Sequence, residues 1–204
     1  MRQKIIVFDF DKTLTYKDTL LAFYIHVSNK SYSYPLKICF YLFCMLLSKI
    51  RVISNDQLKV AGFNLFLRGL ETEDIEARAK VFSSKIKFNK LFTDFDFENK
   101  ECRVFIVSAS FESYLNYCFP GNVTVIGSRY SLNKGRAVEF TLNCYSLTKK
   151  KILREYGIDK IDVFFTDSYS DFGLAEISKE VNVVAGDAIF QMNDLASFKS
   201  YFKK

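Results

Sequence analysis

The sequence predicts an α/β fold with a doubly wound, Rossmann-like parallel sheet and a helical subdomain inserted after its first strand. Several short runs of β-branched and aromatic residues are apolar on both faces, which is typical of strands buried inside a parallel sheet. Helical patterns alternate with these runs in the second half of the chain, as they do in βαβ units. A long, mostly helical stretch interrupts this alternation after the first run.

Three of the apolar runs end in polar residues. These runs and their polar ends are 4–8 with Asp9, 102–107 with Ser108, and 161–165 with Thr166 and Asp167. Ligands bind outside the carboxyl ends of the strands in an open α/β sheet, so we expect these polar ends to meet in one crevice. The sequence therefore predicts a candidate site at this edge of the sheet.

The remaining patterns complete the doubly wound arrangement. Further strand candidates are 123–126 and 181–185, and helical patterns cover 111–117 and 147–156. We expect residues 1–15 and 90–204 to form the α/β core and residues 16–89 to form the inserted helical subdomain. Within that insertion, the ranges with amphipathic patterns are 55–67 and 73–88, and Thr72 is a plausible helix start.

Residues 36–47 are the most apolar segment of the chain, with ten uninterrupted apolar residues from 38 to 47. A helix that spans a bilayer needs roughly 20 such residues, so the segment is too short to favour a transmembrane helix. It fits a buried or semi-exposed helix of the cap. Because Lys37, Lys49 and Arg51 flank it, it also fits a peripheral contact with a membrane or a lipid substrate.

The composition is that of a folded globular protein, with 204 residues of which 49% are hydrophobic and 25% charged. The net charge of +6 is scattered along the chain, so we expect no nucleic acid partner. The five cysteines form no CxxC pair and are predicted to be reduced core residues. The first residues do not resemble a signal peptide, and we expect a cytoplasmic protein, either free or peripheral to the membrane.

Asp9 and Asp11 stand two residues apart, directly after the first predicted strand. Alternation along an extended chain points both carboxylates to the same side, close enough to share a hard cation and a substrate. A carboxylate nucleophile divides phosphoester hydrolysis into two displacements, and a neighbouring acid/base can serve both. The pair also fits a solvated acidic turn or a helix cap.

The segment Asp9-Phe10-Asp11-Lys12-Thr13 resembles the Asp-x-Asp-x-Thr signature of the haloacid dehalogenase-like (HAD) phosphatases. The resemblance implies that Asp9 attacks phosphorus to form an aspartyl-phosphate, and that Asp11 protonates the leaving group and later activates water. It also implies Mg²⁺, bound by the Asp9 carboxylate and the Asp11 backbone carbonyl. Thr13 would supply a hydroxyl that orients the phosphate or the nucleophile.

Two further elements of the family pattern follow in order. Ser108 matches the Ser or Thr that hydrogen-bonds the transferring phosphoryl group, although a serine there also fits the N-cap of a helix near Glu112. The family's lysine, which neutralises charge on the aspartyl-phosphate, falls in the lysine run 149–151. Its spacing from neighbouring residues favours Lys149, with Lys150 as the alternative.

An acidic cluster closes the pattern, because residues 166–171 resemble the family's Asp-Ser-x-x-Asp form. The resemblance makes Asp167 a direct Mg²⁺ ligand. It gives Asp171 the role of holding either metal-bound water or Lys149. The insertion stands in the place of the helical cap of the phosphoserine-phosphatase-like branch of the family, where such a cap closes over the site.

Residues near the site depart from the pattern of phosphoserine phosphatases. Asp18 stands where those enzymes carry the Glu that binds the substrate amine, and Ala109 and Ser110 replace two glycines. Ser170 stands in place of an Asn. We interpret Asp18, Ala109 and Ser110 as candidate substrate contacts, together with Thr13 and with Arg68 of the cap.

The sequence thus predicts a Mg²⁺-dependent phosphomonoester hydrolase that acts on a small phosphorylated metabolite. Bacterial phosphatidylglycerophosphate phosphatases of the same branch carry a comparable apolar stretch early in the cap, which makes a lipid head-group phosphate the alternative substrate. Transfer to an acceptor other than water stays open, because water and alcohols attack the same intermediate. The alternative is a non-catalytic binding protein of the same fold. Because the chain lacks none of the family's catalytic residues, no residue favours this alternative. The single histidine, His26, is interpreted as a packing residue of the cap.

Overall fold

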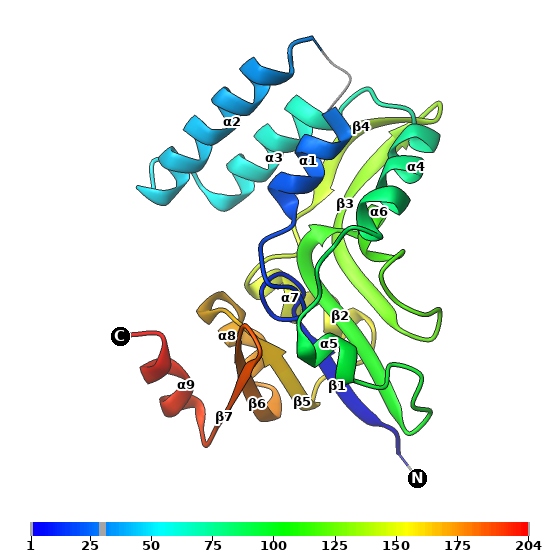
Figure 1. Ribbon diagram of the computed structural model, residues 1–204. Helices are drawn as coiled ribbons and strands as arrows, with labels where there is room; N and C mark the ends of the chain where they lie inside the picture. The colour runs from blue at the N-terminus through cyan, green and yellow to red at the C-terminus, as the bar shows by residue number, and fades with distance from the viewer. Residues whose placement is uncertain (1, 29–31, 204) are drawn as a thin grey trace.

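A seven-stranded sheet runs through the protein in the computed structural model, which describes residues 2–28 and 32–203 (Figure 1). The strands are β1 (Lys4–Phe8), β2 (Cys102–Phe111), β3 (Thr124–Asn133), β4 (Arg136–Leu142), β5 (Ile161–Thr166), β6 (Ser178–Ala185) and β7 (Ala188–Met192). Their order in the sheet is β4-β3-β2-β1-β5-β6-β7, with parallel inner strands and with β4 and β7 antiparallel at the two edges. The predicted doubly wound α/β fold is confirmed.

Strand β1 lies in the middle of this sheet because both of its faces are apolar. Ile5 and Val7 pack into the core on one side, and Ile6 and Phe8 pack into the core on the other. The chain continues from β1 to β2 and β3 on one side of β1 and later returns to β5 on its other side. The carboxyl end of β1, where Asp9 follows, is therefore at the point of reversal where doubly wound sheets bind ligands.

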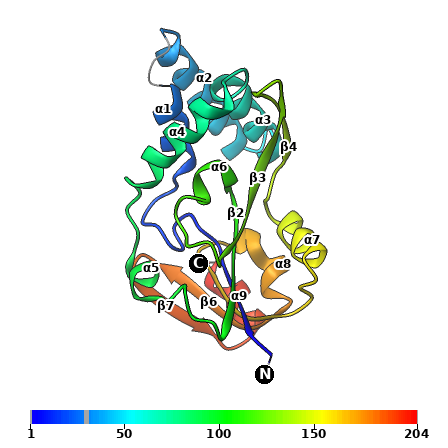
Figure 2. The same ribbon diagram turned by 90° about the vertical axis from the view of Figure 1, so that its right-hand side faces the viewer.

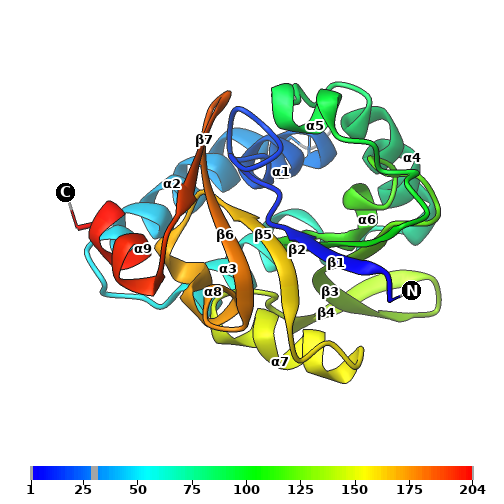
Figure 3. The same ribbon diagram turned by 90° about the horizontal axis from the view of Figure 1, so that it is seen from below.

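Helices cover both faces of the sheet (Figures 2 and 3). The helices are α1 (Leu20–Ser28), α2 (Tyr34–Lys49), α3 (Asn55–Phe66), α4 (Thr72–Ser83), α5 (Lys90–Asp94), α6 (Glu112–Leu115), α7 (Leu147–Glu155), α8 (Phe172–Ala175) and α9 (Leu195–Tyr201), and a 3₁₀-helix, η1, spans Tyr169–Asp171. Side chains of α7, α8 and α9 share one core cluster with the sheet. The aromatic residues Phe95 and Phe97 after α5 pack against Phe8 on the opposite face.

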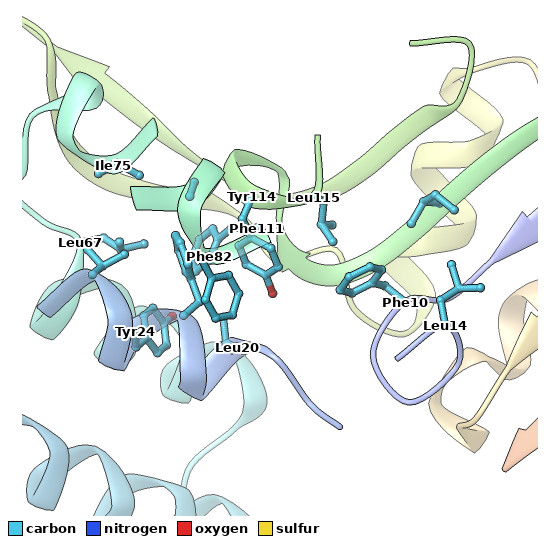
Figure 4. Close-up of a cluster of buried hydrophobic side chains, with 14 of the residues drawn as sticks. Phe10, Leu14, Leu20, Tyr24, Leu67, Ile75, Phe82, Phe111, Tyr114 and Leu115 are labelled. Carbon is cyan, nitrogen blue, oxygen red and sulfur yellow. The ribbon is translucent and has the colours of Figure 1, made fainter. Parts of the chain in front are cut away.

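Helices α1 to α4, here called the cap helices, follow β1 and lie beyond the carboxyl end of that strand (Figure 1). They share a hydrophobic cluster with the end of β2 and with α6 (Figure 4). Tyr114 of α6 is central to it, because its ring contacts Phe23 of α1 and Phe82 of α4 with centroid distances of 4.6 and 5.3 Å. The cap helices are therefore packed directly on the edge of the sheet that carries Asp9.

Two of the cap helices, α3 and α4, begin where the sequence predicted, but α4 is shorter than predicted. The capping box of Ser54 and Gln57 starts α3, and α4 starts at Thr72. The predicted helix over 73–88 is wrong at its end, because α4 stops at Ser83. The chain then extends to Phe88, which pairs with Thr15 in a β-bridge.

The antiparallel edges of the sheet were not predicted. Strands β3 and β4 form a hairpin whose turn residues, Lys134 and Gly135, have positive φ angles of 48° and 74°, as two-residue hairpin turns require. The hairpin also holds the loop between α3 and α4, since the Gly69 N–H donates to the Ala137 carbonyl at 2.7 Å.

The predicted helix over 111–117 is shorter in the structure. It is reduced to the four residues of α6, because β2 continues to Phe111.

The segment 36–47 belongs to α2, whose buried side chains are those of Tyr41 and Cys44. Among the described residues, no helix is both long and apolar enough to cross a bilayer. All five cysteines are free, as expected, but Cys39 lies exposed on α2 rather than in the core.

Candidate active site

A buried lysine joins two carboxylates at the carboxyl edge of the sheet. The Lys149 Nζ, from the first turn of α7, lies 2.7 Å from the Asp9 Oδ1 and 2.8 and 3.0 Å from the two carboxylate oxygens of Asp171. The Thr166 hydroxyl, at the end of β5, donates to the Asp171 Oδ2 at 2.9 Å. All four residues are almost fully buried. Segments that are distant in sequence thus position one charge cluster.

The protonation of Lys149 follows from its two partners. Burial alone lowers the pKa of Lys149, but the Asp171 and Asp9 carboxylates outweigh this effect and raise the pKa above its ordinary value. Lys150 instead pairs with Glu176 at 3.0 Å, outside the cluster. Of the two lysines considered from sequence, the structure therefore brings Lys149 into the site.

The Asp11 carboxylate is fixed by three hydrogen bonds. The Ser110 hydroxyl donates to Oδ2 at 2.5 Å, and the Thr19 backbone N–H and hydroxyl donate to Oδ1 at 2.8 and 2.6 Å. The Tyr114 hydroxyl lies 2.8 Å from the Thr19 hydroxyl. Because the Thr19 hydroxyl donates its proton to Asp11, the Tyr114 hydroxyl is the donor in this second bond. Burial and the nearby Asp18 carboxylate raise the pKa of Asp11. A raised pKa suits a carboxyl group that must donate a proton.

Asp167 faces the Asp9 carboxylate from the end of β5. Burial and the charge of Asp9 raise the pKa of Asp167 to about 7. The Thr13 hydroxyl, 3.5 Å from the Asp167 Oδ1, points at this carboxylate rather than at Asp9. Two facing carboxylates repel each other when ionised, and a divalent cation between them removes that repulsion.

The donor set at this position is of the kind that Mg²⁺ prefers. In the part of the chain that the structure describes, no three His, Cys, Asp or Glu side chains gather as a metal-binding group. Mg²⁺ is commonly held by one or two carboxylates, with the other positions filled by water and phosphate oxygens. The Asp9 and Asp167 carboxylates therefore fit the ion without a third acidic side chain. Asp171 is committed to Lys149, which is the second of the two roles considered for it.

These groups open into a cavity of about 160 Å³. Its lining includes Asp9, Asp11, Ser108, Lys149 and Asp167, so the polar ends of three strands do meet in one crevice. Ser108 is almost fully buried, and its hydroxyl accepts a hydrogen bond from the Ser110 N–H at 3.1 Å. The alternative role of Ser108 as a helix N-cap is wrong, because Phe111 is the residue that precedes α6.

A second cavity, of about 450 Å³, lies between the core and the cap helices. It shares Asp11, Asp18 and Ala109 with the first cavity, which places Asp18 and Ala109, two of the predicted substrate contacts, at the junction of the two. The Asp18 carboxylate also accepts a hydrogen bond from the Leu20 N–H at 3.1 Å, at the start of α1.

Two cap residues lie away from these cavities. Arg68 is exposed and its guanidinium donates to the Asn64 Oδ1 at 3.5 Å, and it is not among the described residues that line either cavity. The structure thus does not bring this predicted substrate contact to the site. The His26 ring packs against Phe82 with a centroid distance of 5.7 Å, in agreement with its interpretation as a packing residue.

Comparison with known proteins identifies the family. Residues 6–176 match the family model of haloacid dehalogenase-like hydrolases. The chain belongs to this family. No curated protein sequence matches this HAD hydrolase significantly. The family assignment thus rests on the family model, and it agrees with the resemblance of the Asp9 to Thr13 motif.

Solved structures with the same fold include several phosphatases. A phosphoserine phosphohydrolase-like protein from Francisella tularensis is 17% identical, with a TM-score of 0.64 over 97% of this chain and 99% of that protein. A phosphoserine phosphatase with a phospho-aspartyl intermediate analogue is 15% identical, with a TM-score of 0.59 over 92% and 88% of the two chains. Cytosolic 5'-nucleotidase IIIB bound to cytidine is 14% identical, with a TM-score of 0.63 over 98% and 86%. At these identities the similarity shows the shared fold of this HAD hydrolase.

The HAD hydrolase also has a site residue that sequence reasoning missed. Lys59 of α3 is 6% exposed, lines the larger cavity, and donates from its Nζ to the Ala109 carbonyl at 2.6 Å. The sequence could have revealed this residue, because helical spacing places Lys59 on the buried face of α3 with residues 62, 63 and 66. A buried lysine needs a polar partner. Thr19, Tyr114 and Tyr145 carry no comparable signal, since only the folded chain places them near Asp11.

Replacing Lys59 by Met is expected to remove a pH-dependent penalty on folding. Burial lowers the pKa of Lys59 from 10.5 to about 8, so the folded state binds fewer protons than the unfolded chain between these values. Relative to the Met variant, the wild type should gain about 3 kcal/mol of stability as pH rises through this range. Urea unfolding below and above this range measures the difference.

The matched control for Lys59 is Lys80→Met, which removes an exposed lysine of α4. Its stability relative to the wild type should not change with pH over the same range. If the Lys59→Met and wild-type stabilities changed in parallel with pH, Lys59 would be a solvated cation rather than a desolvated one.

Proposed function

We propose that the chain is a Mg²⁺-dependent phosphomonoesterase that works through an aspartyl-phosphate on Asp9. The observation that carries this proposal is the fixed position of the Asp9 carboxylate, held 2.7 Å from the buried Lys149 Nζ in a cavity that it shares with Asp11. An oriented anionic nucleophile, a cation and a carboxyl group with a raised pKa are the parts that two-step phosphoester hydrolysis requires.

In the first step, an Asp9 oxygen attacks phosphorus and the bond from phosphorus to the ester oxygen breaks. Asp11 donates its proton to that leaving oxygen. In the second step, Asp11 takes a proton from water as the water oxygen attacks phosphorus, and the bond between Asp9 and phosphorus breaks. Ser108 donates a hydrogen bond to the phosphoryl group, and Lys149 balances the charge of the phosphorylated Asp9.

The Asp9 and Asp167 carboxylates would hold Mg²⁺, together with the Asp11 backbone carbonyl. When bound, the ion neutralises charge on the phosphate oxygens. In this proposal residues 1–15 and 90–204 form the catalytic core, and residues 16–89 form a cap that keeps water from the site. The free cysteines support a reducing, cytoplasmic location.

The substrate that we favour is a small phosphorylated metabolite. The cavity of about 160 Å³ beside Asp9 has room for the phosphate, and the adjoining cavity of about 450 Å³ would take the leaving group. That second cavity is lined by charged side chains, Asp18 and Lys59, and by apolar ones, Leu20 and Met45. Among the similar structures are a phosphoserine phosphatase and a 5'-nucleotidase bound to cytidine, which supports a small polar leaving group.

A lipid head-group phosphate is the second candidate substrate. The observation that favours it is the exposed apolar surface of α2, the helix that also contributes Tyr41 and Met45 to the larger cavity. A lipid phosphate bound at Asp9 would leave the rest of the molecule near this helix.

Phosphate release tests both the activity and its metal. The purified protein should release phosphate from para-nitrophenyl phosphate and from some members of a metabolite panel that also contains phosphatidylglycerophosphate in micelles. EDTA should abolish this activity and added Mg²⁺ should restore it. Asp167→Asn should need at least roughly tenfold more Mg²⁺ for half-maximal activity, because a ligand is lost.

The control for Asp167 is Asp74→Asn, an exposed acid of α4 that should leave the Mg²⁺ requirement unchanged. Equal activity in EDTA and in Mg²⁺ would refute the metal dependence. An absence of phosphate release from every ester and with every divalent metal would favour the non-catalytic alternative.

A further inference from the structure

Helix α2 is the outermost of the cap helices (Figure 1). Several of its apolar side chains are exposed. Five of its side chains are each more than half exposed: Leu36, Phe40, Phe43, Leu46 and the C-cap residue Ile50. We call these five residues the α2 face. With 3.6 residues per turn they lie within about 60° of Phe43 around the helix axis, so they form one continuous stripe. A stripe of this kind on a soluble surface marks an interaction site.

The opposite side of α2 is the one that packs on the protein. Tyr41 is 2% exposed, and its ring contacts Tyr24 of α1 and Phe66 of α3 with centroid distances of 5.3 and 5.5 Å. The helix is thus anchored through the side that carries Tyr41 and Cys44. The α2 face is left outward in a helix whose orientation is fixed.

Positive charge borders the α2 face on both sides. By helical geometry, Lys37 and Lys49 lie roughly 120° to either side of Phe43, and Arg51 follows the end of the helix. In the sequence no Asp or Glu occurs between Asp18 and Asp56. Lysine side chains at such borders can extend their charged ends past an apolar surface.

We propose that the α2 face docks on an anionic membrane surface, with the helix axis parallel to the bilayer. Apolar side chains between flanking cations are the pattern of helices that lie in the interface of anionic lipids. Charge complementarity selects this partner over a second copy of the chain. Two α2 faces packed about a two-fold axis would bring the same cations of both copies, Lys37, Lys49 and Arg51, to one interface.

Docking in this way would place the larger cavity beside the lipid head groups. Tyr41 and Met45 of α2 line that cavity together with Asp11, so α2 connects the proposed docking surface with the site. The proposal does not rest on catalysis, because none of the five residues of the α2 face belongs to the site. Membrane binding and phosphate release can therefore succeed or fail separately.

Vesicle flotation of the full chain tests the proposal. Wild-type protein should float with vesicles of phosphatidylcholine that contain phosphatidylglycerol, and much less with vesicles of phosphatidylcholine alone. Added salt should weaken the binding. The double variant Phe40→Glu with Phe43→Glu should lower the bound fraction by roughly tenfold or more, because it places two anions in the interface. Its circular dichroism and its release of phosphate from a soluble ester should match those of the wild type.

The matched control is Phe190→Glu, which changes a 44% exposed phenylalanine of β7, at the other end of the molecule (Figure 1). This variant and Asp9→Asn should float as the wild type does. The proposal is overturned if wild-type protein does not bind the anionic vesicles, or if the double variant binds them equally well. It is also overturned if the α2 face is a dimer interface. In that case the wild type would have the mass of a dimer in solution and would not bind vesicles, and the double variant would have the mass of a monomer.

Discussion

Replacing Asp9 by Asn is expected to lower kcat for para-nitrophenyl phosphate by roughly 10⁴-fold or more. An amide oxygen is a poor nucleophile toward phosphorus, and loss of a covalent nucleophile has effects of this order. The effect should appear in kcat rather than in KM, because the small change leaves the cavity intact. Intact-mass spectrometry after acid quenching should detect one added phosphoryl group on the wild type and none on the variant.

The control for Asp9 is Asp159→Asn, which changes an 83% exposed side chain 3.8 Å from Arg154. Its turnover should equal that of the wild type. This result would show that loss of an acidic charge alone does not cause the lower kcat of Asp9→Asn. Wild-type turnover in Asp9→Asn would exclude Asp9 as the nucleophile. A phosphoryl group found on another residue of the wild type would move that role to that residue.

Replacing Lys149 by Met is expected to destabilise the protein by about 3–5 kcal/mol and to suppress turnover. The substitution leaves Asp171 buried without its cation, and removing one partner of a buried ion pair has a cost of this size. Lys150→Met is a close control, because it breaks only the partly exposed pair with Glu176 and should cost less than about 1 kcal/mol. Urea unfolding and kcat measure both effects.

The pH dependence of the Lys149 variant provides an independent test. Burial raises the pKa of Asp171 to about 6, above its value of 3.8 in an unfolded chain, even with Lys149 present. Without the lysine, folding of the ionised carboxyl is still less favourable, so the stability lost should be larger at alkaline pH than at acidic pH. Equal losses for the two lysine variants, or a loss that does not depend on pH, would contradict the buried ion pair.

The fold and the centre of the site could be predicted because their signals are local. Uninterrupted apolar runs mark the buried strands, and the residue that follows each run emerges at the carboxyl edge of the sheet. Asp9, Ser108 and Asp167 could therefore be assigned to one crevice from their positions at the ends of these runs. Lys149 and Asp171 were assigned instead from the resemblance to a family, since a lysine run alone is more often a solvated surface.

The parts that could not be predicted depend on contacts between distant segments. The β3–β4 hairpin has mixed polar and apolar residues at an exposed edge, so its pairing is recognisable only with the Lys134-Gly135 turn in view. Lys59 meets the Ala109 carbonyl across 50 positions of sequence. The shortened α6 reflects competition in which strand pairing of Phe111 with Ser128 prevails over a local helical pattern.

The hydrogen bonds of Thr19 connect the position of α1 with the proposed proton transfer. Thr19 immediately precedes α1, and it supplies two of the three hydrogen bonds that fix the Asp11 carboxylate. A displacement of α1 away from the sheet would therefore also remove these two hydrogen bonds from the proposed acid/base. Under the proposed mechanism, Asp11 would be held ready for proton transfer only while the start of α1 keeps this position.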